Sequence, residues 1–123
     1  MNKNLKLVPL GVYDVATQGG TNGDTYELTD GQPIHANDVV KDVVIEVITP
    51  LVGAGDITVK DGSANAITAV VPAGDVNSFV KNAVGVITRK AGTTGQARIT
   101  VGTADLTAGK LRVWAELIVA PSG

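Results

Sequence analysis

The chain has 123 residues, and ten lysines and arginines against twelve aspartates and glutamates give it a formal net charge of -2. This length suits one domain with a core of its own, and the small negative charge offers no electrostatic footprint for nucleic acid or an anionic membrane. Aromatic residues make up only 3% of the chain, and cysteine is absent. The composition therefore predicts a core of small branched side chains, which favours an all-β domain, and it excludes disulfides and thiolate zinc sites.

The first residues place two lysines before a short apolar run, as secretory signals do. Lys6 and Pro9 interrupt that run and no small-residue cleavage pattern closes it, so we expect mature sequence there. The chain also lacks the roughly 20 consecutive apolar residues that a membrane-spanning helix needs. We expect a protein made in the cytoplasm, in which residues 1–23 form an arm, or a first strand and a loop, and residues 24–123 form a β-sandwich domain.

Short apolar segments separated by turn-forming residues recur along the chain. Pro9 would bend the first of them, because proline cannot donate a hydrogen bond to a sheet. Residues 39–48 are apolar on much of both faces, which predicts a central strand that ends at Thr49 and Pro50. Glycines predict a connection at residues 53–55 and hairpin turns at residues 61–63 and 91–95. We expect strands at residues 5–15, 25–28, 39–48, 57–60, 66–71, 85–90, 96–101 and 110–119.

The last of these strands has the most regular pattern. Its inward face would carry Leu111, Val113, Ala115, Leu117 and Val119, because side chains alternate with a period of two. Its other face would carry Lys110, Arg112, Trp114 and Glu116 and stay partly solvated.

Residues 74–82 alone show a helix-like pattern. Asp75 could cap one or two turns that place Val76, Phe79 and Val80 inward. About eight short strands with at most one short helix predict a two-sheet β-sandwich or a jelly-roll-like barrel.

Few residues are suited to catalysis. His35, the single histidine, stands near Asp38, but without a second histidine or a cysteine a turn or surface role is expected. No serine stands in the Gly-x-Ser-x-Gly setting of a nucleophile elbow. The aspartates are spread over turns rather than clustered as calcium ligands are, namely Asp14, Asp24, Asp30, Asp56, Asp61, Asp75 and Asp105. We therefore predict a protein that is not an enzyme and takes no metal, cofactor or small-molecule substrate.

Basic residues and the tryptophan are the candidates for contacts with another protein. Arg89, Lys90 and Arg98 are expected to meet across the second hairpin, and Arg112 adds a basic edge to the last strand. These charges either discourage aggregation at strand edges or form a contact patch for an acidic partner. Trp114 points away from the apolar face, so it either completes a second layer or anchors an interface.

Two segments, residues 49–59 and 107–114, resemble small virion proteins of tailed bacteriophages, among them head decoration or cement proteins. The shared features are a Val/Ile strand, a Pro-Leu-x-Gly-x-Gly connection, an alternating strand and a closing Ala-Gly-Lys-x-Arg-Val strand, within residues 39–119. This resemblance implies a β-sandwich, often trimeric, that sits on the capsid lattice and bridges neighbouring capsomers. Residues 1–23 depart from it.

The resulting hypothesis is a structural protein on the exterior of a phage capsid that is assembled in the host cytoplasm. Its expected partners are the major capsid protein and itself, as a homotrimer, with neither nucleic acid nor membrane. The expected contact residues are Lys3, Lys6, Arg89, Lys90, Arg98, Arg112 and Trp114. The alternative is a recognition module of a phage tail or fibre that binds a carbohydrate or cell-surface ligand, for which the whole aromatic inventory is Tyr13, Tyr26, Phe79 and Trp114.

Overall fold

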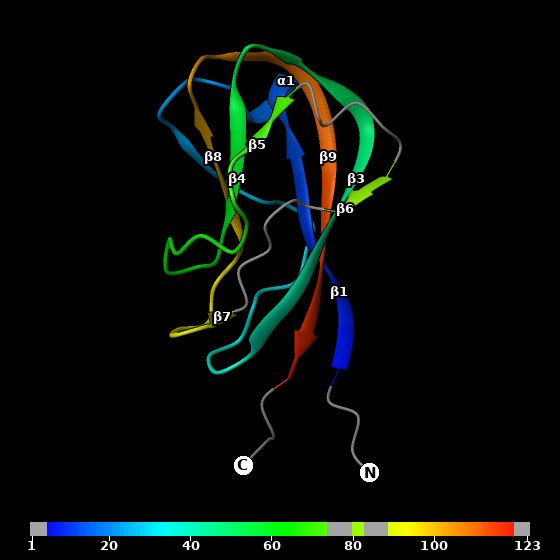
Figure 1. Ribbon diagram of the computed structural model, residues 1–123, viewed down its shortest axis with the longest axis vertical. Coiled ribbons are helices and arrows are strands. Elements are labelled where there is room, and N and C mark those ends of the chain that lie inside the picture. The colour runs from blue at the N-terminus through cyan, green and yellow to red at the C-terminus, as the bar shows by residue number, and fades with distance from the viewer. Residues whose placement is uncertain (1–4, 74–79, 83–88, 120–123) are drawn as a thin grey trace.

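The computed structural model describes residues 5–73, 80–82 and 89–119, which form two antiparallel sheets in a sandwich (Figure 1). Sheet A contains, in order, β1 (Leu5–Asp14), β9 (Leu106–Ile118), β3 (Val39–Gly53) and β6 (Val80–Asn82), and β7 (Arg89–Lys90) also pairs with β3. Sheet B contains, in order, β2 (Thr25–Glu27), β8 (Arg98–Gly102), β4 (Asp56–Lys60) and β5 (Val71–Pro72). The predicted all-β sandwich is confirmed.

The core lies between the two sheets. The alternation predicted for the last strand is confirmed in β9, where Leu111, Val113, Ala115 and Leu117 are buried. Sheet B supplies the facing layer through Ile57, Val59, Ile99 and Val101. Each fully buried aliphatic side chain of this kind contributes about 1.5–3 kcal/mol through removal of apolar surface from water.

The helix differs from the prediction. The structure has α1 (Val15–Gln18), whose first turn Asp14 caps by accepting hydrogen bonds from the Ala16 N–H and the Thr17 hydroxyl. Of the expected helix, residues 74–79 lie outside the described residues, and residues 80–82 form strand β6 instead. Within the described residues, no helix has the length and apolar character needed to cross a membrane.

The expected end of the third strand at Thr49 and Pro50 is wrong. β3 continues to Gly53 and stays paired with β9, although the register shifts several times after Val47. Such irregular pairing tolerates a proline, and Leu51 beyond it is buried in the core. In edge strand β1, the bend expected at Pro9 is confirmed as a register shift between Pro9 and Gly11 in the β1–β9 pair.

A two-stranded ribbon passes from sheet A to sheet B at one end of the sandwich. β3 leads into β4 and β8 leads into β9, and both links lie together at the top of Figure 1. Gly53 has φ +130°, and a Cβ atom on it would lie 2.5 Å from the Asp105 carbonyl oxygen. A Cβ atom on Gly55 would overlap the Ala104 carbonyl oxygen. The connection predicted at residues 53–55 is therefore a corner where two backbones touch.

The two predicted hairpin turns, at residues 61–63 and 91–95, have different outcomes. The turn at residues 61–63 is confirmed, since Asp61 Oδ1 accepts the N–H groups of Ser63 and Asn65 and Lys60 bridges to Ala66. The strand expected at residues 66–71 is mostly wrong, because β5 is only Val71–Pro72.

The hairpin around residues 91–95 is wrong. β7 pairs with β3 in sheet A, whereas β8 pairs with β2 and β4 in sheet B. The segment between β7 and β8 thus passes between sheets instead of turning back on itself, and residues 83–88 lie outside the described residues.

The corner makes a testable prediction. Gly53→Ala should lower the free energy of unfolding by about 2–4 kcal/mol, because the new Cβ adds both backbone strain and overlap. Urea unfolding followed by circular dichroism measures this. Gly92→Ala is the matched control, since a Cβ atom there meets nothing within 4 Å. Equal effects of the two substitutions would contradict the account of the corner.

Candidate interaction surface

Trp114 lies on the outward face of sheet A, at its centre. Its neighbours Val113 and Ala115 are buried in the core, so the indole projects to the other side of β9. Across the sheet it stands opposite Pro9 of β1 and Val44 of β3. The side chain is half-buried in this position.

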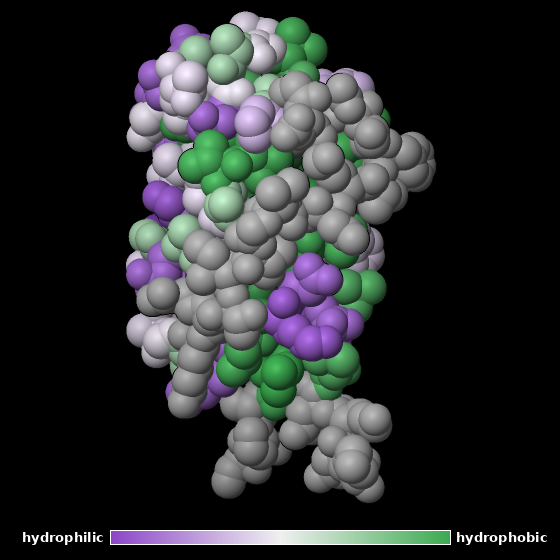
Figure 2. All heavy atoms as spheres, viewed as in Figure 1, coloured by the Kyte–Doolittle hydropathy of each residue, from purple (hydrophilic) through white to green (hydrophobic). Residues whose placement is uncertain are grey.

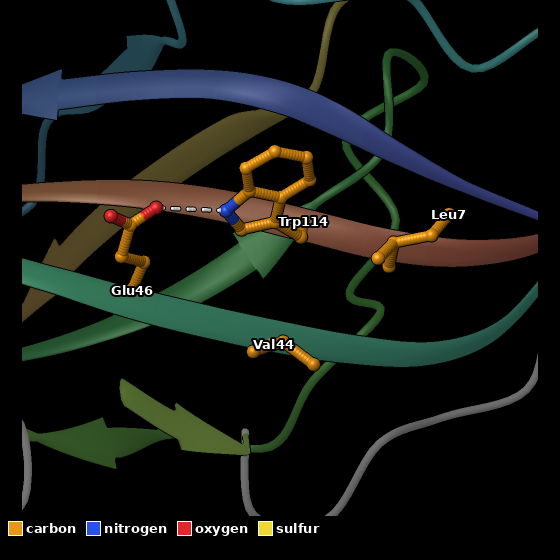
Figure 3. A pocket seen from close by; sticks show the side chains of 4 residues that line it. All are labelled: Leu7, Val44, Glu46 and Trp114. Atoms are coloured by element: carbon orange, nitrogen blue, oxygen red, sulfur yellow. Dashed lines mark hydrogen bonds between the residues drawn. The ribbon is translucent and has the colours of Figure 1, made fainter. Parts of the chain in front are cut away.

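A carboxylate fixes the indole ring. The Trp114 Nε1–H donates a hydrogen bond of 3.0 Å to Glu46 Oε1, as Figure 3 shows. Arg112 Nη1 donates to the same oxygen at 3.3 Å, because Arg112 and Glu46 stand directly opposite each other on β9 and β3. The ring is therefore held in one orientation before any partner arrives, which reduces the entropy lost on binding.

A shallow hollow of about 210 Å³ lies beside the ring, lined by Leu7, Val44, Glu46 and Trp114 (Figure 3). These residues come from three neighbouring strands, and three of the four are apolar. Leu7 is 61% exposed. We call Leu7, Val44, Glu46, Arg112 and Trp114 the Trp114 face. Its shape and lining suit an apolar side chain presented by another protein.

Two ion pairs lie on the same face as the hollow. Lys41 Nζ lies 3.3 Å from Glu116 Oε1, and Arg112 Nη1 lies 3.3 Å from Glu46 Oε1. Half-exposed pairs of this kind contribute little to stability. The rest of the face is formed by the apolar side chains of Leu7, Val44 and Trp114.

The structure brings together only part of the predicted contact set. Arg112 and Trp114 are neighbours on one face. Lys6 pairs with Leu117, so it lies on the opposite face of sheet A from Leu7. Arg98 belongs to sheet B, opposite Glu27 and Lys60.

The predicted cluster of Arg89, Lys90 and Arg98 depended on a hairpin that does not form. β7 and β8 belong to different sheets. Lys3 and the side chains of Arg89 and Lys90 lie outside the described residues, so their roles as contacts stay predictions.

Sequence reasoning missed Leu7, Val44 and Glu46. Period-two alternation places Val44 and Glu46 on the same face of their strand, opposite the face of Val43 and Ile45, and this is the signal that the sequence offers. Their proximity to Trp114 depends on the register of β3 against β9. Glu46 and Trp114 are 68 residues apart in the chain, and local sequence pattern does not show which residues of such distant strands lie opposite each other.

The histidine and the acidic side chains of the described residues do not form a metal-binding cluster. No group of three or more His, Asp or Glu side chains among them could hold a metal ion. His35 is a turn residue with a 66% exposed side chain, and its Nδ1 lies 3.8 Å from Asp38 Oδ2. The same carboxylate accepts the His35 backbone N–H at 3.1 Å, which organises the turn.

Tyr13 and Tyr26 form a structural pair. Their rings stack with centroids 5.7 Å apart. The Tyr13 hydroxyl donates to the Gly19 carbonyl at 2.8 Å, and the Thr21 N–H donates to the Tyr26 oxygen at 2.9 Å. Burial raises the pKa of Tyr13 well above its usual value, and Tyr26 raises it further. This pair holds the loop after α1 on the sandwich.

The pKa shift of Tyr13 predicts alkaline destabilisation. Above about pH 10 the unfolded state loses the phenol proton while the folded state keeps it, so the free energy of unfolding should fall as pH rises. Tyr13→Phe should cost about 1 kcal/mol at neutral pH, through the lost hydrogen bond, and should show a smaller fall above pH 10. Urea unfolding across this pH range measures both effects. Tyr26→Phe, which keeps the Tyr13 phenol, should retain the alkaline fall.

The Trp114–Glu46 contact can be followed by tryptophan fluorescence, because Trp114 is the single tryptophan of the chain. Glu46→Ala should loosen the indole, increase acrylamide quenching of its fluorescence and lower stability by about 1 kcal/mol. Glu116→Ala, on the same face but bonded to Lys41, is the control. Identical quenching in both variants would contradict the anchoring role of Glu46.

Comparison with known proteins gives a structural relationship. No protein-family model matches the chain, and no curated protein matches it. A chain in the acidic stable capsid structure of the Helicobacter pylori bacteriophage KHP30 is similar, with a TM-score of 0.61 and 12% sequence identity. The match covers 97% of this chain and 90% of that chain. This likeness shows that the two share a fold over nearly their whole lengths.

Proposed function

We propose that this protein is a structural component of a bacteriophage virion, which binds the outside of the capsid and stabilises contacts between capsomers. The carrying observation is the fold shared with a chain of a phage capsid structure, over 97% of this chain. The two segments that resemble decoration proteins support it, since residues 49–53 of β3 pair with residues 106–110 of β9. Both segments thus contribute to one corner of the sandwich.

The Trp114 face supports binding to another protein. It offers an indole held by a hydrogen bond, an apolar hollow and two ion pairs nearby, and aromatic residues in such surroundings often contribute strongly to binding. We assign this face to the contact with the major capsid protein. Many weak copies of such a contact on a symmetric lattice would together bind strongly.

A protein that bridges neighbouring capsomers must contact the capsid through more than one region. We propose that the protein supplies them as a homotrimer. Native mass spectrometry over a wide dilution range tests this part: a persistent trimer is the expected result, and a monomer at every concentration would contradict it.

Substitution of Trp114 tests the capsid contact. Trp114→Ala should weaken binding to capsids assembled without this protein by about tenfold or more, since buried tryptophans rank among the strongest interface residues. Cosedimentation over a concentration series measures the affinity. The variant should have the same oligomeric state as the parent chain in native mass spectrometry.

Val70→Ala is the matched control, because Val70 is an exposed apolar residue outside sheet A. Unchanged capsid binding by Trp114→Ala would contradict the assignment. Loss of the trimer with this variant would instead place the Trp114 face between copies of the chain.

A carbohydrate-binding module is the second candidate, and one observation favours it: the indole borders an open hollow. Sugars need polar partners around such a ring, and Glu46 is the one polar residue among the described residues that line this hollow. Tyr13 is fully buried and so cannot extend the platform. A glycan array separates the two functions, since binding that Trp114→Ala abolishes would favour the carbohydrate.

A further inference from the structure

The edge strand β1 of sheet A has two halves that differ. Its second half is covered, because Val12 and Thr29 exchange backbone hydrogen bonds of 2.7 and 3.0 Å. The Gln32 N–H also donates to the Pro9 carbonyl oxygen at 2.8 Å. Residues 5–8 form the first half, and no strand within residues 5–73, 80–82 and 89–119 pairs with their outer side.

The backbone groups on this open side can be identified. The Pro9 carbonyl bonds to Gln32, so it points away from β9. In an antiparallel pair, successive residues direct their N–H and C=O groups to alternate sides. The N–H and C=O groups of Leu7 and Leu5 therefore also point away from β9, and they form a short unpaired ladder.

The side chains next to this ladder are apolar. Leu5 is 43% and Leu7 is 61% exposed, and both lie on the same side of sheet A as Trp114. Open edges are commonly protected by a charged residue, and Lys6 supplies one here, on the opposite face of the strand from both leucines. Exposed leucines beside an open ladder are what an added strand would cover.

A second copy of this chain fits the edge poorly. Antiparallel pairing of two such edges would set Leu5 of each copy against Leu7 of the other and would place Lys6 directly opposite Lys6. Like charges directly opposite destabilise a sheet. A shift toward Pro9 would use a residue with no N–H, whose carbonyl is already bonded to Gln32. Within residues 5–9 neither register favours self-pairing, so these residues favour a different chain.

We propose that residues 5–8 bind an extended segment of another protein by antiparallel strand addition. The segment carries an acidic residue opposite Lys6, with apolar residues on both sides of it, opposite Leu5 and Leu7. Lys6 makes no ion pair within the described residues, so its charge is available to this residue. The pairing follows from the edge itself, and only the identification of the segment with the capsid protein rests on the proposed function.

The added strand would extend the Trp114 face. Leu7 belongs to both surfaces, since it lines the hollow and borders the open edge. Apolar side chains of the segment would lie next to Leu7 and shield it from water. Strand addition therefore supplies backbone hydrogen bonds and register to a surface whose other contacts are apolar.

The test uses synthetic peptides on the whole protein. The probe is the capped peptide Gly-Thr-Val-Asp-Val-Thr-Gly, and the comparison peptide has Lys in place of Asp. Titration followed by amide NMR should shift the Leu5 and Leu7 signals and slow their hydrogen exchange. The Asp peptide should bind roughly three- to tenfold more tightly than the Lys peptide.

Charge reversal provides the decisive control. Lys6→Glu should reverse the preference between the two peptides, whereas Lys60→Glu in β4 of sheet B should leave it unchanged. An absence of shifts at Leu5 and Leu7 with the Asp peptide would overturn the proposal. An unchanged preference in Lys6→Glu would also overturn it.

Leu7→Pro tests the backbone ladder. It removes an N–H that points to the open side without removing a bond to β9, so peptide binding should be lost while the urea midpoint stays close to that of the parent. If Leu7→Pro does not fold, the Lys6→Glu reversal decides alone. Capsid binding, measured on the same protein preparations, distinguishes the two proposals. Capsid binding without peptide binding would refute only the strand addition. Peptide binding without capsid binding would refute only the proposed function.

Discussion

The antiparallel pairing of β3 with β9 is the constraint on which the rest of the structure depends. Their inward side chains, among them Ile45 and Val113, fill the middle of the core. At one end of the sandwich β3 leads into β4 and β8 leads into β9, so the same two strands connect sheet A with sheet B. Their outward side chains create the Trp114 face, because one register sets Arg112 opposite Glu46 and Trp114 opposite Val44. Core, corner and candidate surface therefore follow from one alignment of two strands.

The outward face of sheet A combines exposure with order. An apolar surface that faces water carries a risk of nonspecific association, and two features limit it here. The indole nitrogen is bonded to a carboxylate, and ion pairs stand next to the hollow. Such a surface is rigid and selective before it meets a partner, since a partner must match its shape and leave these paired charges undisturbed.

Local pattern predicted those parts of the fold that depend on neighbouring residues. The faces of β9 follow from period two, and the Asp61 turn and the glycine corner follow from residue conformation. Strand partners do not follow, because the hairpin rule assumes that adjacent segments pair, whereas β7 and β8 join different sheets. For the same reason the outward direction of Trp114 was predictable and its neighbours Glu46 and Leu7 were not. They come from strands distant in the chain, aligned by core packing.

The position of β9 bears on how the protein is made. Among the described strands β9 is the last to be synthesised, yet it lies between β1 and β3 in sheet A. The nascent chain cannot complete the sheet until residues 106–118 have left the ribosome, and until then the apolar faces of β1 and β3 lack their partner. Contacts between such distant segments form slowly. Completion of sheet A therefore waits for the synthesis of β9, and the waiting strands need protection from aggregation during that interval.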